Sequence, residues 1–181
     1  MLLSSARSQL VIVDVQERLA PAMNEMEAAL AKIERLACAA RILDVPLTVS
    51  EQYPKGLGPT LPRVLKACGG DCVVLPKLDF SCGRDLALAQ RITALGRPQT
   101  IICGFEAHVC VLQSAIDLAA RGQACFVVVD AVASRREESR QIALRRLERS
   151  GVTLVTTEMA IFEWLGQAGT AQFKALAPLV K

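Results

Sequence analysis

Short apolar runs alternate with amphipathic helical patterns along this chain. Most runs are continuous, without a polar residue at every second position, which is typical of strands buried on both faces of a parallel sheet. Six strands are predicted, at Gln9–Asp14, Pro46–Ser50, Cys72–Leu75, Thr100–Gly104, Ala124–Asp130 and Val152–Val155. Helices are predicted at Met26–Leu43, Asp85–Leu95, Val109–Arg121, Arg136–Arg149 and Glu158–Leu165, and the last dozen residues also have a helical pattern.

The order of these elements predicts an α/β fold. Strands separated by helices form a three-layer αβα sandwich around a doubly wound, Rossmann-like parallel sheet of six strands. The 181 residues contain no repeat or linker, so we expect a single domain over residues 1–181. One long section, residues 51–70, reads as irregular. Because it follows the second strand, we expect it to form a lid or an interface at the carboxyl edge of the sheet.

The composition excludes several classes of protein. With 52% hydrophobic and 22% charged residues, the chain is typical of a compact domain. The net charge of +3 does not indicate nucleic-acid binding, and the arginines between Ser134 and Arg149 are mixed with glutamates, as on a solvated helix face. No apolar stretch reaches the ~18 residues of a membrane span. We therefore expect no nucleic acid and no membrane among the partners.

The cysteines indicate a reducing compartment. Their number, seven, is odd, and Cys103 and Cys125 lie inside predicted strands, where a small apolar side chain is useful. The chain does not open with the basic and apolar segments of a signal peptide. We expect a cytoplasmic protein with free thiols.

The segment Gln99–Leu112, QTIICGFEAHVCVL, holds the strongest indication of chemistry. An apolar strand pattern ends at Gly104, and a helical pattern begins close to Cys110. At the amino end of a helix, unpaired N–H groups and the helix dipole lower the pKa of a cysteine and favour its thiolate. Open α/β sheets also bind their ligands at the carboxyl edge, where this turn lies. Cys110 is therefore a candidate nucleophile.

Two further polar residues stand where predicted strands end. Asp14 closes the first strand and Lys77 follows the third. Because the carboxyl ends of parallel strands meet at one edge, both side chains can converge with Cys110 in a single crevice. A thiol needs a base to accept its proton and a cation to favour the thiolate, and a carboxylate with an ammonium group supplies both.

Metal and cofactor sites find little support. His108 is the only histidine, which excludes zinc sites built on several histidines within one chain. It lies two positions before Cys110, so on a helix the two side chains point apart and a Cys–His pair is not expected. Cys68, Cys72 and Cys82 could supply three thiolates, but a fourth ligand is missing. No glycine-rich phosphate loop occurs. We expect no metal and no cofactor.

Five segments carry a family resemblance: VIVDVQERL (11–19), SEQYPKGLGPT (50–60), PKLDFSC (76–82), CGFEAHVCVLQSAIDL (103–118) and DAVASR (130–135). In this order and spacing, the chain resembles the isochorismatase-like cysteine hydrolases over nearly its whole length. The second segment and GFEAHVCV look most like the isochorismatase-domain-containing branch. The Asp, Lys and Cys of the family's catalytic triad fall on Asp14, Lys77 and Cys110.

The resemblance implies a role for each member of this triad. Asp14 would accept the thiol proton and later activate water, while Lys77 would hold the carboxylate and stabilise charge. Cys110 would attack an amide or related carbonyl to form a thioester. A non-proline cis peptide, here Phe105–Glu106, would aim the N–H of Glu106, together with that of Cys110, at the developing oxyanion.

The residues around the triad can also be named. The pocket walls are expected to come from Leu19, Tyr53 and Phe80 together with residues 51–70, with Phe105 as a further substrate contact, which suggests a small, partly apolar substrate. The family forms symmetric assemblies, so we expect a homo-oligomer.

The sequence departs from two branches of this superfamily. Nicotinamidases bind a metal through an Asp-x-His after the second strand, where this chain has Glu51, Gln52 and Tyr53. Isochorismatases that cleave a vinyl ether often lack the cysteine, which is present here as Cys110. The leading hypothesis is a metal-independent cysteine hydrolase acting on a small amide-like substrate. Two alternatives stay open: vinyl-ether hydrolysis with Asp14 as the acid, and a non-catalytic interaction protein on the same scaffold.

Overall fold

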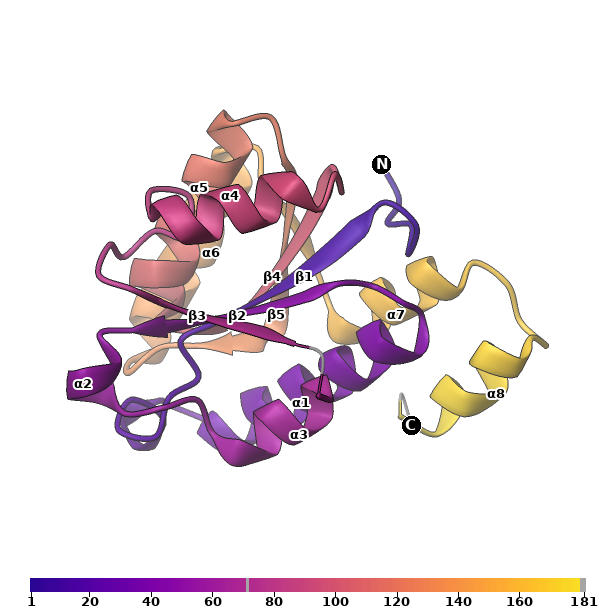
Figure 1. Ribbon diagram of the computed structural model, residues 1–181, viewed down its shortest axis with the longest axis horizontal. Coiled ribbons are helices and arrows are strands. Elements are labelled where there is room, and N and C mark those ends of the chain that lie inside the picture. Colours follow the sequence, from indigo (N-terminus) through magenta and orange to yellow (C-terminus); the bar gives the residue numbers. More distant parts are fainter. Residues whose placement is uncertain (71, 180–181) are drawn as a thin grey trace.

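A parallel six-stranded sheet forms the centre of the molecule (Figure 1). The computed structural model describes residues 1–70 and 72–179. Strand order is β3-β2-β1-β4-β5-β6, so the winding reverses between β1 and β4, which is where doubly wound sheets open a ligand crevice. The predicted αβα fold is confirmed. Its strands are β1 Ser8–Val13, β2 Leu47–Gln52, β3 Val73–Lys77, β4 Gln99–Phe105, β5 Ala124–Ala133 and β6 Thr153–Val155.

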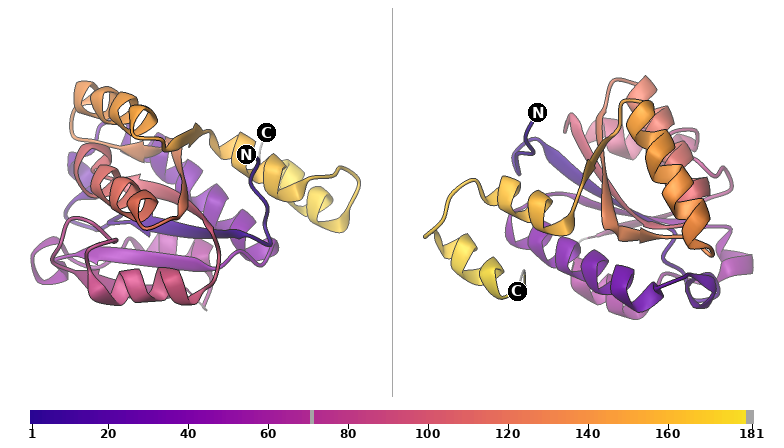
Figure 2. Two further views of the ribbon diagram at one scale, coloured as in Figure 1. Left: turned by 90° about the horizontal axis from the view of Figure 1, so that it is seen from above. Right: turned by 180° about the vertical axis from the view of Figure 1, so that it is seen from behind.

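Helices cover both faces of the sheet (Figures 1 and 2). The strand β1 shows why its sequence is continuously apolar: Leu10 and Ile12 point into one core, Val11 and Val13 into the other. One face carries α1 Met26–Ile42, α3 Pro62–Cys68 and α7 Thr157–Leu165. The opposite face carries α4 Leu86–Ala94, α5 Leu112–Ala120 and α6 Glu137–Arg149.

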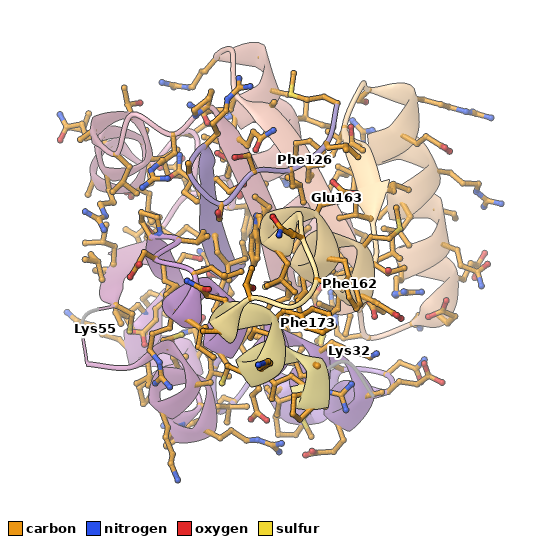
Figure 3. All side chains as sticks on the ribbon, turned by 90° about the vertical axis from the view of Figure 1, so that its right-hand side faces the viewer. Lys32, Lys55, Phe126, Phe162, Glu163 and Phe173 are labelled. Carbon is orange, nitrogen blue, oxygen red and sulfur yellow. The ribbon has the colours of Figure 1, made fainter. Side chains whose placement is uncertain are left out.

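The C-terminal residues extend beyond the sandwich (Figure 2). Figure 3 looks onto α7 and onto α8, which spans Ala171–Leu176 and is followed by a 3₁₀ turn at Ala177–Leu179; Phe162 and Phe173 are labelled on these two helices. The Leu3 N–H donates to the Glu163 carboxylate over 2.7 Å, which ties the start of the chain to α7. The helical prediction for the last dozen residues is confirmed up to Leu179, and residues 180–181 lie outside the described residues.

Residues 51–70 are more regular than their composition suggests. They complete β2 and form the short helix α2, Pro54–Leu57, and then α3. Pro54 and Pro62 stand at the first turns of these helices, where a missing N–H is tolerated, so the prolines start helices rather than break them. The section is also bonded to the end of β1, because the Glu17 N–H donates to the Pro59 carbonyl and the Leu61 N–H to the Val15 carbonyl. The prediction of an irregular section is therefore wrong.

Two further expectations concern the chemistry of the whole chain. All seven cysteines are free thiols, as predicted. Within the described ranges, no helix has the length and hydropathy needed to cross a membrane.

Candidate active site

Asp14 lies directly after β1 and is completely buried. Its backbone is left-handed, with φ 53°, which turns the side chain back across the sheet edge. Oδ1 accepts a hydrogen bond from Ser50 Oγ at 2.7 Å, and Oδ2 accepts one from Lys77 Nζ at 2.7 Å. Both carboxylate oxygens are therefore held by donors from β2 and β3.

Lys77 is the last residue of β3 and is buried beside Asp14. Its Nζ has three acceptors: Asp14 Oδ2, Gln52 Oε1 at 2.6 Å and the Phe80 carbonyl at 3.2 Å. Burial alone would lower the pKa of Lys77, but the charge of Asp14, with a smaller contribution from Cys110, outweighs burial and raises it. The ammonium group keeps its charge, and all three of its donors are occupied.

Ser50 and Gln52 were missed as site residues in the sequence. Both lie on β2, where Ser50 pairs with Val13 of β1 and Gln52 pairs with Lys77 of β3. Gln52 Nε2 donates to the Leu78 carbonyl at 2.8 Å, which orients the amide oxygen toward Lys77. The available signal was a serine and a glutamine two positions apart in a buried strand, where polar side chains need internal partners.

Cys110 joins this group from the connection between β4 and α5. The structure has a π-helical turn at Ala107–Val111 and starts α5 at Leu112, whereas one continuous helix from Val109 is predicted. The thiol is buried, with 4% exposure, and lies close enough to Asp14 and Lys77 for both charges to act on its pKa. The structure thus brings the three predicted triad side chains together.

The pKa of the Cys110 thiol shifts in the direction opposite to the sequence-based expectation. Burial, followed by the charge of Asp14, raises the pKa of Cys110, and the opposing effect of Lys77 is smaller. The predicted lowering by a helix N-terminus is wrong, because the thiol faces a carboxylate in a buried environment. A thiol beside a carboxylate can pass its proton to that carboxylate as it attacks.

The chain turns before Cys110 without a cis peptide. Phe105–Glu106 is trans, and no described peptide bond is cis, so the predicted cis bond is wrong. The reversal comes instead from positive φ angles at Gly104, 124°, and Glu106, 58°. A Cβ at Gly104 would lie 2.1 Å from the Val13 carbonyl oxygen, so only glycine allows β4 to approach β1 here.

The expected substrate contacts divide into two groups. Tyr53 and Phe80 are about half exposed, and both flank Lys77: the Tyr53 N–H donates to its carbonyl, and the Phe80 carbonyl accepts from its Nζ. Phe105 is fully buried in the core that faces α1, opposite the core that contains Cys110. The alternation of side chains along β4 puts it there, so the expected contact by Phe105 is wrong. Leu19 packs partly buried against the same α1-side core.

The remaining candidates are the histidine and the other cysteines considered as metal ligands. His108 Nδ1 lies 3.0 Å from Ser134 Oγ, on the side of β5. Cys68 and Cys82 belong to the cores on opposite faces of the sheet, so the three thiolates are not brought together. Among the described residues, no group of three or more His, Cys, Asp or Glu side chains is placed to bind a metal.

Comparisons with known proteins show the family of this chain. A family model described as the isochorismatase domain matches residues 8–159. Isochorismatase domain-containing protein 2 from Danio rerio is 37% identical over 181 residues, which covers 98% of this chain and 89% of that protein.

Solved structures share the fold. One described as MAR1 ribonuclease from Caenorhabditis elegans has a TM-score of 0.93 and 35% identity, covering 99% of this chain and 92% of its own. The YcaC gene product of Escherichia coli, described as an octameric hydrolase of unknown specificity, has a TM-score of 0.92 at 23% identity, covering 99% and 90%. At that identity the likeness shows the fold alone.

Proposed function

The chain belongs to the isochorismatase family of hydrolases, and we propose that it is a cysteine hydrolase that cleaves a C–N bond in a small, amide-like substrate. One observation carries this proposal: the buried Cys110 thiol lies beside the Asp14 carboxylate, whose oxygens are positioned by Ser50 and Lys77. A nucleophile, its base and the groups that orient the base are the parts that acyl transfer requires.

In the proposed reaction, Asp14 accepts the thiol proton as Sγ of Cys110 attacks the substrate carbonyl. The carbonyl electron pair moves to the oxygen, then returns to expel the amine, which takes the proton from Asp14. Asp14 next accepts a proton from water as that water attacks the thioester, and the thiol leaves with the proton. A positioned base contributes about 10²–10⁴-fold to such a reaction.

The oxyanion is proposed to bind backbone donors rather than Lys77. The three donors of Lys77 already have acceptors, so its proposed role is to hold Asp14 in place. The N–H groups of Glu106 and Cys110 are the proposed oxyanion donors, since both belong to the turn that carries the nucleophile. One such donor is worth roughly 3 kcal/mol in the transition state.

We propose that no metal or cofactor takes part. Glu51 stands in the region where metal-binding relatives carry their ligands, but its Oε1 accepts hydrogen bonds from the N–H and hydroxyl of Thr60 at 2.7 and 2.8 Å. The Gln52 Oε1 atom accepts a hydrogen bond from Lys77 Nζ. These side chains stabilise the fold around the triad and have no free coordination position on those atoms.

The substrate is proposed to be small and to carry an apolar substituent. Tyr53, Leu78 and Phe80 are exposed apolar or aromatic side chains next to Lys77 in the sequence or in space. We also propose a homo-oligomer, since the YcaC neighbour is described as octameric.

The experiment that tests this function combines a substrate panel with trapping of the intermediate. The purified protein is mixed with primary and secondary amides that carry small apolar groups, quenched in acid within milliseconds to seconds, and digested for mass spectrometry. The proposal predicts amine release and an acyl group on the Cys110 peptide. Hydrolysis without any acylated Cys110, under conditions that trap a burst, would contradict it. Full activity in the presence of a chelator is also expected.

RNA hydrolysis is the second candidate. The 35% identical C. elegans structure is described as a ribonuclease. In this chain a hollow of about 360 Å³ is lined by His108, Arg135, Arg136 and Ser139, which offers cationic and hydroxyl groups to a phosphate. Phosphodiester cleavage does not need a thioester, so RNA cleavage that persists in Cys110→Ala would favour this candidate. Isochorismate belongs in the same panel, because vinyl-ether cleavage by Asp14 would also survive that substitution.

A further inference from the structure

Glu106 has an unusual backbone conformation beside the nucleophile. It links β4 to the π-helical turn that carries Cys110, with φ 58° and ψ 62°. Few residues other than glycine adopt this left-handed conformation, and it persists where the surroundings hold it. The Glu106 carbonyl accepts the N–H groups of Val109 at 2.9 Å and Val111 at 3.3 Å. The conformation of Glu106 therefore sets how the turn around Cys110 is built.

The side chain of Glu106 is anchored by a residue from a different part of the chain. The carboxylate is only 8% exposed, and its Oε1 accepts a hydrogen bond from Arg135 Nε at 2.8 Å. Its Oε2 lies 3.4 Å from His108 Nδ1 and has no hydrogen-bond partner among the described residues. Arg135, which follows β5, is thus the one cation that donates a hydrogen bond to this buried carboxylate within the described chain.

We propose that Arg135 is a positioning residue for the hydrolase reaction: its ion pair with Glu106 holds the Glu106 backbone in the conformation that directs the turn's N–H groups at the oxyanion. This inference rests on the proposed function and deepens it. An exposed arginine contributes little through its charge alone, and the Arg135 side chain is 60% exposed. Its importance comes from the carboxylate, because a buried carboxylate without its cation is strongly unfavourable and the turn would rearrange to expose it.

Arg135 should affect the stabilisation of the oxyanion without affecting the ionisation of the Cys110 thiol. Burial, Asp14, Lys77 and Cys82 shift the pKa of Cys110, and Arg135 is not among these causes. A loss of Arg135 is therefore expected to leave thiol ionisation unchanged and to weaken only the stabilisation of negative charge on a bound carbonyl oxygen.

Two alkylating reagents separate these effects without a natural substrate. Iodoacetamide loses iodide as the Cys110 sulfur forms its bond to carbon, so its rate reports how available the thiolate is. Acrylamide reacts by addition: the sulfur bonds to the terminal carbon, the C=C electron pair shifts toward the carbonyl oxygen, and the α-carbon then takes up a proton. Its rate depends on the thiolate and also on donors to that oxygen. Peptide mass spectrometry resolves Cys110 from the other six thiols.

The ratio of the acrylamide rate to the iodoacetamide rate at Cys110 is the measured quantity. We expect Arg135→Ala to lower this ratio about 10-fold or more, on the scale of a misplaced oxyanion donor, and Arg135→Lys to restore most of it. Glu106→Gln should lower it as well. Arg84→Ala is the matched control, because Arg84 Nε binds Asp117 at 2.8 Å with 63% exposure and lies outside the site. It should leave the ratio unchanged.

An unchanged ratio in folded Arg135→Ala, or an equal fall in Arg84→Ala, would overturn the inference. So would an equal loss of both rates, because that would mean a disturbed thiol. Thermal melting confirms that each variant is folded, and Glu106→Gln keeps the test open if Arg135→Ala does not fold. Failure of the proposed function looks different: no amide is hydrolysed or no acyl group forms on Cys110, while the reagent ratio still responds to Arg135.

Discussion

Lys77 and Asp14 form an ion pair in which Nζ lies 2.7 Å from Oδ2 and neither side chain has any exposed surface. Two buried charges are tolerated only where their remaining hydrogen-bonding groups are satisfied. Lys77 also donates to Gln52 and to a backbone carbonyl, and Asp14 also accepts from Ser50. The pair is therefore a complete polar network, and it fixes the carboxylate that faces the thiol.

Replacing Asp14 by asparagine should separate thiol reactivity from catalysis. The charge of Asp14 raises the pKa of Cys110, while Lys77, which lowers it, stays in place. In Asp14→Asn the pKa of Cys110 should therefore fall, and iodoacetamide should modify Cys110 faster near pH 8, with the rate rising at lower pH than in the parent. Amide hydrolysis should drop by about 10²-fold or more, because the base is lost.

The same substitution should also destabilise the protein. Lys77 keeps two acceptors but loses its counter-charge, so we expect a loss of about 3 kcal/mol in the free energy of unfolding, measured with urea. Slower alkylation of Cys110 in the asparagine variant, or retained hydrolysis, would contradict the assigned contact between the carboxylate and the thiol.

Alkaline pH should destabilise the fold through its buried thiols. Burial raises the pKa of Cys68 and of Cys125 to about 12, and it also raises the pKa of Cys82, Cys103 and Cys110. In the unfolded chain these thiols ionise near about 8.5. The contribution of these thiols to folding stability is thus fully present below that pH. It is lost as the pH rises toward their pKa values in the folded protein, because the thiols of the unfolded chain release their protons first.

Urea unfolding in the presence of a reductant measures this effect. The free energy of unfolding should change little between pH 7 and 8 and then fall steeply up to about pH 10.5, at up to about 1.4 kcal/mol per pH unit for each of these thiols. Cys125→Ala should reduce the slope. A constant stability up to pH 10.5 would mean that these thiols are not buried as the structure shows.

Gly104 should be far less tolerant of alanine than Gly122. Both have positive φ, 124° and 90°. A Cβ at Gly104 would overlap the Val13 backbone, whereas a Cβ at Gly122 would have no neighbouring atom within 4 Å among the described residues. We expect Gly104→Ala to lower the free energy of unfolding by about 4 kcal/mol or to prevent folding, and Gly122→Ala to lower it by about 1–2 kcal/mol. Similar losses at the two positions would contradict the close approach of β4 to β1.

The fold was predictable because the residues that build it act locally. Continuous apolar runs such as the one ending at Asp14 need burial on both faces, and only a parallel sheet between helices provides it. The meeting of Asp14, Lys77 and Cys110 followed from the same argument, since strand ends share an edge. The helices within residues 51–70 were not predictable in this way, because a sequence does not show whether Pro54 and Pro62 begin helices or interrupt them.

The electrostatic details of the site were not predictable from the sequence. Whether Cys110 lies at a helix end or faces a carboxylate depends on how the π-helical turn packs, and the packing reversed the expected direction of its pKa. Ser50 and Gln52 were not recognised as site residues, because they belong to a mostly apolar strand pattern and their hydrogen-bond partners come from other parts of the sheet. Such contacts depend on register, which a single sequence does not determine.

The central claim is that Cys110 is the nucleophile, and hydrolysis by Cys110→Ala tests it most directly. Cys125→Ala is the matched control, since Cys125 is also a buried thiol in the core that contains Cys110 but lies away from Asp14 and Lys77. On an amide that the parent hydrolyses, we expect Cys110→Ala to lose at least about 10³-fold in kcat while keeping its thermal melting temperature. Cys125→Ala should keep its activity. Undiminished hydrolysis by folded Cys110→Ala would contradict the account.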